Sequence, residues 1–135
     1  MNLPRISIQL DRQDGRYPPG DAVHAQITLG NPEKTSAVVE ALECSVLWYT
    51  VGKGEEDLAV HHFERLESDR LNGQACEPPM TIQCALPASP LSYDGVIVKV
   101  CWCVRARAFL QGGQEVVEDA PFRLGDVPAA KIVPE

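Results

Sequence analysis

The sequence predicts an all-β domain, an immunoglobulin-like antiparallel β-sandwich of about seven strands. Three observations lead to this prediction. Short segments in which apolar and polar residues alternate recur along the chain, and a period of two residues is the pattern of a half-buried strand. Glycine, proline and aspartate gather between these segments, as they do in turns. No stretch shows a convincing helical period, because proline or glycine interrupts most candidates.

The first three expected strands cover residues 5–10, 23–29 and about 38–51. Apolar residues occupy every second position for most of each segment, so one face of each strand should be buried. Gly30-Asn31-Pro32 closes the second strand, and Glu40 interrupts the pattern near the start of the third. The residues expected to face the core are Ile6, Ile8, Leu10, Val23, Ala25, Ile27, Leu29, Leu42, Cys44, Val46 and Trp48.

The remaining expected strands cover residues 58–66, 80–86, 96–110 and 114–124. The third of these has the most regular alternation in the chain, with an apolar residue at every second position from Val96 to Leu110. Trp102 lies on that apolar face, and we expect it to fill the space between the two sheets. Gly112-Gly113 is typical of a hairpin turn into the last strand.

Length and composition indicate one folded domain. The chain has 135 residues, of which 44% are hydrophobic and 23% charged, so a domain over residues 1–125 can bury its own core, followed by a proline- and alanine-rich tail over residues 126–135. A net charge of −7 argues against nucleic-acid binding. No apolar run approaches the roughly 20 residues of a membrane span. The amino terminus lacks the basic start and apolar block of a signal peptide, so we expect a cytoplasmic protein without direct membrane insertion.

The cysteines are expected to be reduced thiols, because their number is odd and no secretory signal is evident. Cys44 and Cys84 fall on apolar positions and should be small core residues. Cys101 and Cys103 share one strand face and could form half of a zinc site, but the sequence shows no second closely spaced pair of ligands. We therefore expect no metal and no other cofactor. The five cysteines are Cys44, Cys76, Cys84, Cys101 and Cys103.

No catalytic motif stands out. The segment Gly52-Lys53-Gly54 lacks the spacing of a phosphate-binding loop, and no serine lies in a nucleophile elbow. His61 and His62 are adjacent in an expected strand, so their side chains should point to opposite faces. The sequence favours a protein that is not an enzyme. The alternative is a small metal- or ligand-binding sandwich, or a hydrolase, that uses the face of Cys101 and Cys103.

Three segments together resemble the amino-terminal domain of the arrestin family. Residues 16–23 (RYPPGDAV) are similar to the family's Y-x-P-G-[DE]-x-V segment before the second strand. Residues 86–95 (LPASPLSYDG) are similar to its L-P…P-x-S-[YF]-x-G segment, and residues 98–106 (VKVCWCVRA) to the strand that follows. Their order and spacing match the family over nearly the whole chain. Gly20 and Gly95 should both supply the positive φ of a tight turn.

The resemblance implies an arrestin-like fold and a non-catalytic adaptor or scaffold. Arrestins have two such sandwiches, whereas this chain has the length of one. The resemblance is therefore to a single-domain, prokaryotic-type relative of the family. The phosphate sensing and cargo capture of receptor arrestins depend on two domains, so they are not carried over. Residues 78–81 (PPMT) lack the tyrosine of the family's ligase-recruiting tails.

A basic stripe on an acidic chain is the first candidate for a docking surface. Lys99, Arg105 and Arg107 share one face of their strand. They could contact an acidic partner, or they could pair with acids on neighbouring strands, which is the more ordinary arrangement. The candidate acidic neighbours are Glu40, Glu43 and Glu115.

The third strand supplies the second candidate. Leu47, Tyr49 and Val51 are apolar where the outer face should be polar. Either a loop such as residues 68–79 covers them, or a partner does. We expect that partner to be another protein, or a second copy in a homodimer, bound through these residues or through a free sheet edge.

Overall fold

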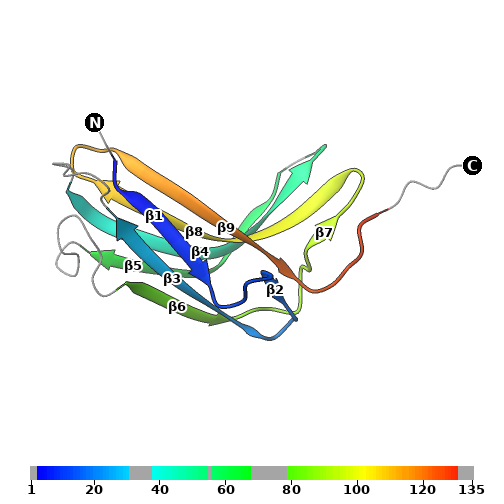
Figure 1. The fold of residues 1–135 in the computed structure, drawn as a ribbon. Coiled ribbons are helices and arrows are strands. Elements are labelled where there is room, and N and C mark those ends of the chain that lie inside the picture. Colours follow the sequence, from blue (N-terminus) through cyan, green and yellow to red (C-terminus); the bar gives the residue numbers. More distant parts are fainter. Residues whose placement is uncertain (1–2, 31–37, 55, 68–78, 131–135) are drawn as a thin grey trace, which may run out of the picture.

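The computed structural model describes residues 3–30, 38–54, 56–67 and 79–130. Within these ranges the regular secondary structure consists of strands alone, arranged in two packed sheets (Figure 1). The predicted β-sandwich is therefore confirmed. The described ranges contain no helix that is long and apolar enough to cross a membrane.

The smaller sheet has three antiparallel strands, in the order β1-β3-β6. These strands are β1 (Arg5–Leu10), β3 (Ala22–Gly30) and β6 (Met80–Ala85). The larger sheet has the order β2-β9-β8-β4-β5, and β7 also pairs with β8. Its strands are β2 (Arg16–Tyr17), β4 (Val39–Gly52), β5 (Leu58–Glu67), β7 (Tyr93–Asp94), β8 (Val98–Leu110) and β9 (Glu115–Leu124).

The seven longer strands lie close to the predicted ranges, and two details differ. Two short strands, β2 and β7, fall in segments expected to be turns, and β2 runs parallel to β9. The strand expected from Val96 begins at Val98 instead, and Val96 is exposed. Glu40, which interrupts the sequence pattern, lies at a shift in the register between β4 and β8.

The core lies between the two sheets, on the faces predicted to be apolar. Trp102 is only 1% exposed, and Phe122 lies against its ring with the centroids 5.9 Å apart, which confirms the predicted place of the tryptophan. Cys44 and Cys84 are buried in the same core, as expected. Of the predicted inward-facing residues of the first three strands, three are only partly buried: Ile8, Leu10 and Trp48.

Two glycines in the segments that resemble arrestins have different physical roles. Gly20 has φ +85°, as expected for a tight turn. The expectation for Gly95 was wrong, because its φ is not positive. A Cβ at Gly95 would instead lie 2.3 Å from the carbonyl oxygen of Val98 and 2.6 Å from the ring of Tyr93. Glycine is needed there because two chain segments approach closely.

Candidate partner-binding face

One face of the larger sheet carries every residue that the sequence singled out for partner binding. It is the face turned away from the three-stranded sheet, and we call it the outer face. Neighbouring strands bring Leu47 opposite Cys103, Tyr49 opposite Cys101, and Val51 opposite Lys99. The outer face comprises Glu43, Ser45, Leu47, Tyr49, Val51, Leu58, Val60, Phe63, Arg65, Lys99, Cys101, Cys103, Arg105, Arg107, Val117 and Asp119.

The three apolar candidates of the third predicted strand differ in how far they are covered. Leu47 is 2% exposed, Tyr49 is partly buried and Val51 is exposed. Burial is the main cause that raises the pKa of Tyr49, and the nearby thiols of Cys101 and Cys103 add to it. Leu47 is therefore covered within the chain itself and cannot be a free contact residue. Most of the loop considered as its cover, residues 68–78, lies outside the described residues.

The sequence missed the exposed apolar residues of β5. Leu58, Val60 and Phe63 lie on the outer face, and each is more than half exposed. The sequence does not show that they share a face, because Val60 follows Leu58 by two positions whereas Phe63 follows Val60 by three. The cause is a bulge at His61, since Val60 lies opposite Leu47 whereas His62 lies opposite Val46.

The same bulge overturns the expectation that the two histidines point to opposite faces. His61 Nε2 lies 2.7 Å from the carbonyl oxygen of Ala85 in the other sheet, and its ring lies edge-on to Trp102. His62 is opposite Val46 on the inner face and forms an ion pair with Glu64 at 2.8 Å when it is protonated. Both side chains thus lie on the inner side of the larger sheet.

The basic stripe is only partly neutralised. Arg105 donates two hydrogen bonds to the carboxylate of Asp119, at 2.8 and 3.1 Å, and these bonds raise its pKa. The pairing that the sequence favoured is therefore present for Arg105, with an acid that was not among the candidates. Arg107 lies opposite Glu43, but Glu43 pairs with Arg65. Within the part of the chain that is described, Arg107 and Lys99 form no ion pair.

A shallow depression of about 150 Å³ lies at the centre of these residues. Leu47 belongs to its lining together with exposed aliphatic residues of β5 and two arginines of β8. An apolar centre with a charged rim is the usual anatomy of a protein interface. The residues that line the depression are Glu43, Ser45, Leu47, Leu58, Val60, Arg105 and Arg107.

Cys103, on the outer face, is poorly suited to metal or nucleophilic chemistry. Cys103 is buried, and this burial, with a contribution from Asp119, raises its pKa to about 12. The thiolate is the form that binds metals and attacks substrates, and it is disfavoured here. Among the described residues, no group of three or more His, Cys, Asp or Glu side chains is placed to hold a metal ion. Cys76 lies outside the described residues.

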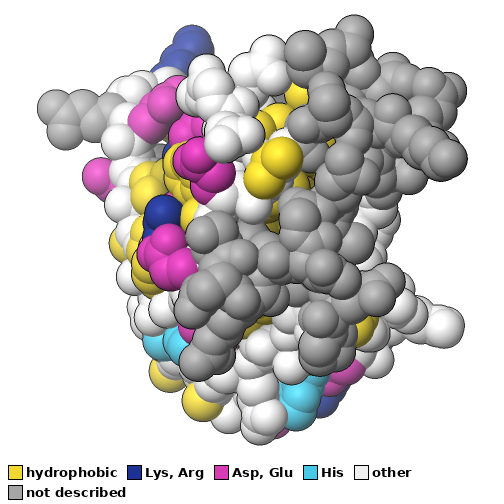
Figure 2. Space-filling view, turned by 90° about the vertical axis from the view of Figure 1, so that its left-hand side faces the viewer, with side chains coloured by type: hydrophobic (Ala, Val, Ile, Leu, Met, Phe, Trp, Pro, Cys, Tyr) yellow, Lys and Arg dark blue, Asp and Glu magenta, His cyan; other side chains and the backbone are white. Residues whose placement is uncertain are grey.

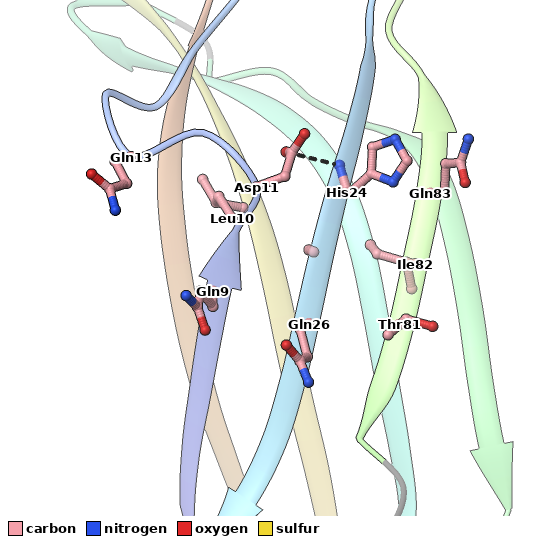
Figure 3. Close-up of a pocket in the computed structure, with 10 residues that line it drawn as sticks. Gln9, Leu10, Asp11, Gln13, His24, Gln26, Thr81, Ile82 and Gln83 are labelled. Atoms are coloured by element: carbon pink, nitrogen blue, oxygen red, sulfur yellow. Dashed lines mark hydrogen bonds between the residues drawn. The ribbon is translucent and has the colours of Figure 1, made fainter.

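A second concave surface, of about 460 Å³, lies on the three-stranded sheet (Figure 3). The side chains of Gln9, Gln26, Thr81 and Gln83 belong to it, and they are neutral. The carboxylate of Asp11 accepts hydrogen bonds from the Tyr17 hydroxyl at 2.5 Å and the His24 amide at 3.1 Å. Burial works to raise the pKa of Asp11, but these hydrogen bonds outweigh it and the pKa is lowered. We see no nucleophile paired with a base among these lining residues.

Comparison with known proteins shows the fold. No protein-family model matches the sequence, and no curated protein matches it. The structure is similar to that of Spo0M, the sporulation control protein of Bacillus subtilis, with a TM-score of 0.63 at 16% sequence identity. The match covers 94% of this chain and 51% of Spo0M, so the chain spans about half the length of that protein. The sandwich is arrestin-like, as the three segments predicted.

Proposed function

We propose that this domain is a non-catalytic protein-interaction module, an adaptor or scaffold in the cytoplasm, that binds a partner protein through the outer face. The observation that carries the proposal is the row of Leu58, Val60 and Phe63, each more than half exposed on one sheet face beside the buried Leu47. Single exposed aliphatic residues are ordinary, whereas a contiguous apolar patch indicates an interaction site.

The charges beside this patch suggest which partner it suits. Arg107 lines the central depression, and Lys99 lies farther along β8 on the same face. Neither forms an ion pair within the described residues. A partner with an apolar centre and acidic residues at its edge would bury the β5 side chains and neutralise both cations. Arg105 would contribute packing more than charge, because Asp119 already neutralises it.

The raised thiol pKa values support the non-catalytic part of the proposal. Burial raises the pKa of Cys44, as of Cys103, to about 12, and it also raises that of Cys84. Neutral, buried thiols serve as packing groups. The described residues also lack a placed nucleophile and base, so the exposed apolar face is the feature that best accounts for a function.

The experiment is an affinity capture from the native organism with three immobilised proteins: the wild type, Val60→Asp with Phe63→Asp, and Leu3→Asp. Leu3 is also an exposed aliphatic residue but lies outside the outer face, so it is the matched control. The proposal expects a protein that the wild type and the control retain and the double variant loses. Circular dichroism and a thermal melt establish that all three are folded. If every specifically retained protein still binds the folded double variant, the outer face is not the binding site.

A further inference from the structure

One end of the larger sheet extends past the smaller sheet. β4 has 14 residues and β8 has 13, whereas β1, β3 and β6 have between six and nine. At about 3.3 Å per residue, β4 is about 46 Å long and the strands packed on it about 20–30 Å. Figure 1 shows the paired ends of β4 and β8, at the right, rising away from the three-stranded sheet. We call residues 50–54 and 95–100 the overhang.

The tip of the overhang is apolar although it is exposed. Ile97 is 68% exposed and Val96 is 62% exposed, and Val98 and Val51 beside them are also exposed. In a turn between two strands, polar residues and glycine are the usual occupants. Figure 2, which views the opposite end of the sandwich, shows hydrophobic side chains there lying among acidic ones. The tip of the overhang instead presents three successive aliphatic residues to the solvent.

The backbone of this tip is held in one arrangement. The amide of Lys53 donates to the carbonyl oxygen of Ile97 at 3.2 Å, and the amide of Gly95 donates to that of Val98 at 3.0 Å. A Cβ at Gly52 would lie 2.1 Å from the carbonyl oxygen of Ile97, and φ at Gly52 is +145°. Gly52 and Gly95 are therefore both required by this packing. A preordered apolar tip loses little conformational entropy when it is buried in a contact.

Charges of both signs surround the tip. Lys53 and Lys99 are exposed, and so are Glu56 and Asp57. Asp57 is tied to the overhang, because its backbone pairs with Thr50 and its amide donates to the Thr50 hydroxyl at 2.8 Å. A surface with one sign of charge would suit a partner of the opposite sign. A surface with both signs is able to pair with a copy of itself, because under a two-fold axis each contact occurs twice, so a lysine of one copy that meets an acid of the other is matched by the reciprocal pair.

We propose that the overhang is a self-association surface, and that its occupant is the overhang of a second copy of this chain. The two apolar tips bury each other, and the lysines of each copy face the acids of its mate. An anionic membrane suits the tip less well, because Glu56 and Asp57 would face lipid phosphates and the chain carries a net charge of −7. The self-association surface shares Val51 and Lys99 with the outer face but does not include Val60 and Phe63. It goes beyond the proposed function, and variants at Ile97 and at Val60 with Phe63 tell the failure of one from the failure of the other.

Sedimentation velocity of the full chain tests this inference. We expect dimers of the wild type at tens of micromolar, and an increase of at least tenfold in the dimer dissociation constant for Ile97→Asp. Val60→Asp with Phe63→Asp should dimerise like the wild type. Ile97→Ser replaces Ile97→Asp if the latter fails to fold by circular dichroism.

A charge-reversal arm makes the test specific. Lys53→Glu with Lys99→Glu, and Glu56→Lys with Asp57→Lys, should each dimerise more weakly than the wild type, and an equal mixture of the two should form heterodimers. A wild type that stays monomeric at 100 micromolar overturns the inference, as does a dimer that Ile97→Asp leaves unchanged. Binding of a monomeric wild type to vesicles containing phosphatidylserine, lost in Ile97→Asp, would assign the tip to a membrane instead.

Discussion

Trp102 donates its indole N–H to the backbone carbonyl of Pro90, at 2.8 Å. The bond joins the middle of β8 to the segment before β7 and satisfies the one polar group of a side chain that is otherwise buried between the sheets. A buried indole without such an acceptor would destabilise the core. Trp102 thus both fills the core and fixes the neighbouring segment.

Trp102→Ala should lower the free energy of unfolding by about 3–5 kcal/mol, as other truncations of large buried aromatics do. Trp102→Phe keeps most of the volume and leaves the Pro90 carbonyl without its donor, so a smaller loss is expected. Urea titrations followed by circular dichroism measure both. A loss below about 1 kcal/mol for Trp102→Ala would contradict the place of this side chain in the core.

Leu47 and Val51 share a strand face but should respond differently to the same change. Leu47→Asp puts a carboxylate at a buried position and should cost more than about 3 kcal/mol. Val51→Asp alters an exposed position and should cost less than about 1 kcal/mol. Thermal and urea melts of the two variants make the comparison. Equal, small losses would show that Leu47 is not covered within the chain.

The Tyr17–Asp11 hydrogen bond should make stability depend on pH at both extremes. The pKa of Asp11 is lowered in the folded state, so its contribution is present above the unfolded pKa near 3.8 and is lost as the pH falls. Burial, with the bond to Asp11, raises the pKa of Tyr17, so its contribution is lost as the pH rises above 10. Tyr17→Phe should cost about 1–2 kcal/mol at pH 7.

The check is a series of urea titrations from pH 3 to pH 11, with Tyr93→Phe as the matched control. The difference between the wild type and Tyr17→Phe should shrink as the pH falls below about 4, because the unfolded chain takes up a proton at Asp11 there whereas the folded wild type, with its lowered pKa, resists protonation. A difference that stays constant across the acidic range would mean that Asp11 is not the acceptor that matters.

The cysteines should differ in how readily an alkylating reagent labels them. Cys44 and Cys103 are buried with raised pKa values, so they should stay unlabelled at pH 8 until the protein unfolds. Cys101 is partly exposed and should be labelled sooner. Mass spectrometry of the peptides gives the order of labelling. Titration of the denatured, unreduced protein should find five thiols, and a lower number would indicate a disulfide.

Alternation in the sequence predicted the faces of the strands well, because burial of one face imposes a period of two. Val23, Val46 and Trp102 all lie where the pattern placed them. The pattern failed where a bulge changed the period, so the common face of Val60 and Phe63 was not seen. It failed again at Val96, because alternation cannot show that the second sheet ends before the strand begins.

The structure places the predicted site residues on one face, as expected, but it changes which of them are free to contact a partner. Leu47, Tyr49 and Val51 do lie together on the outer face, but burial removes Leu47 from the list of free contacts. Whether Arg105 or Arg107 forms an ion pair depends on the neighbouring strands, since β8 contains no acidic residue of its own. The expected hairpin at Gly112-Gly113 placed β9 beside β8, but it did not give the register that puts Asp119 opposite Arg105.

The central claim is that the outer face binds a partner protein, and a titration calorimetry measurement with the purified captured partner tests it most directly. We expect Val60→Asp with Phe63→Asp to raise the dissociation constant at least about tenfold, which corresponds to about 1.4 kcal/mol, because these side chains would lie at the centre of the contact. Leu3→Asp should bind as the wild type does. A folded double variant that binds its partner with unchanged affinity would contradict the claim.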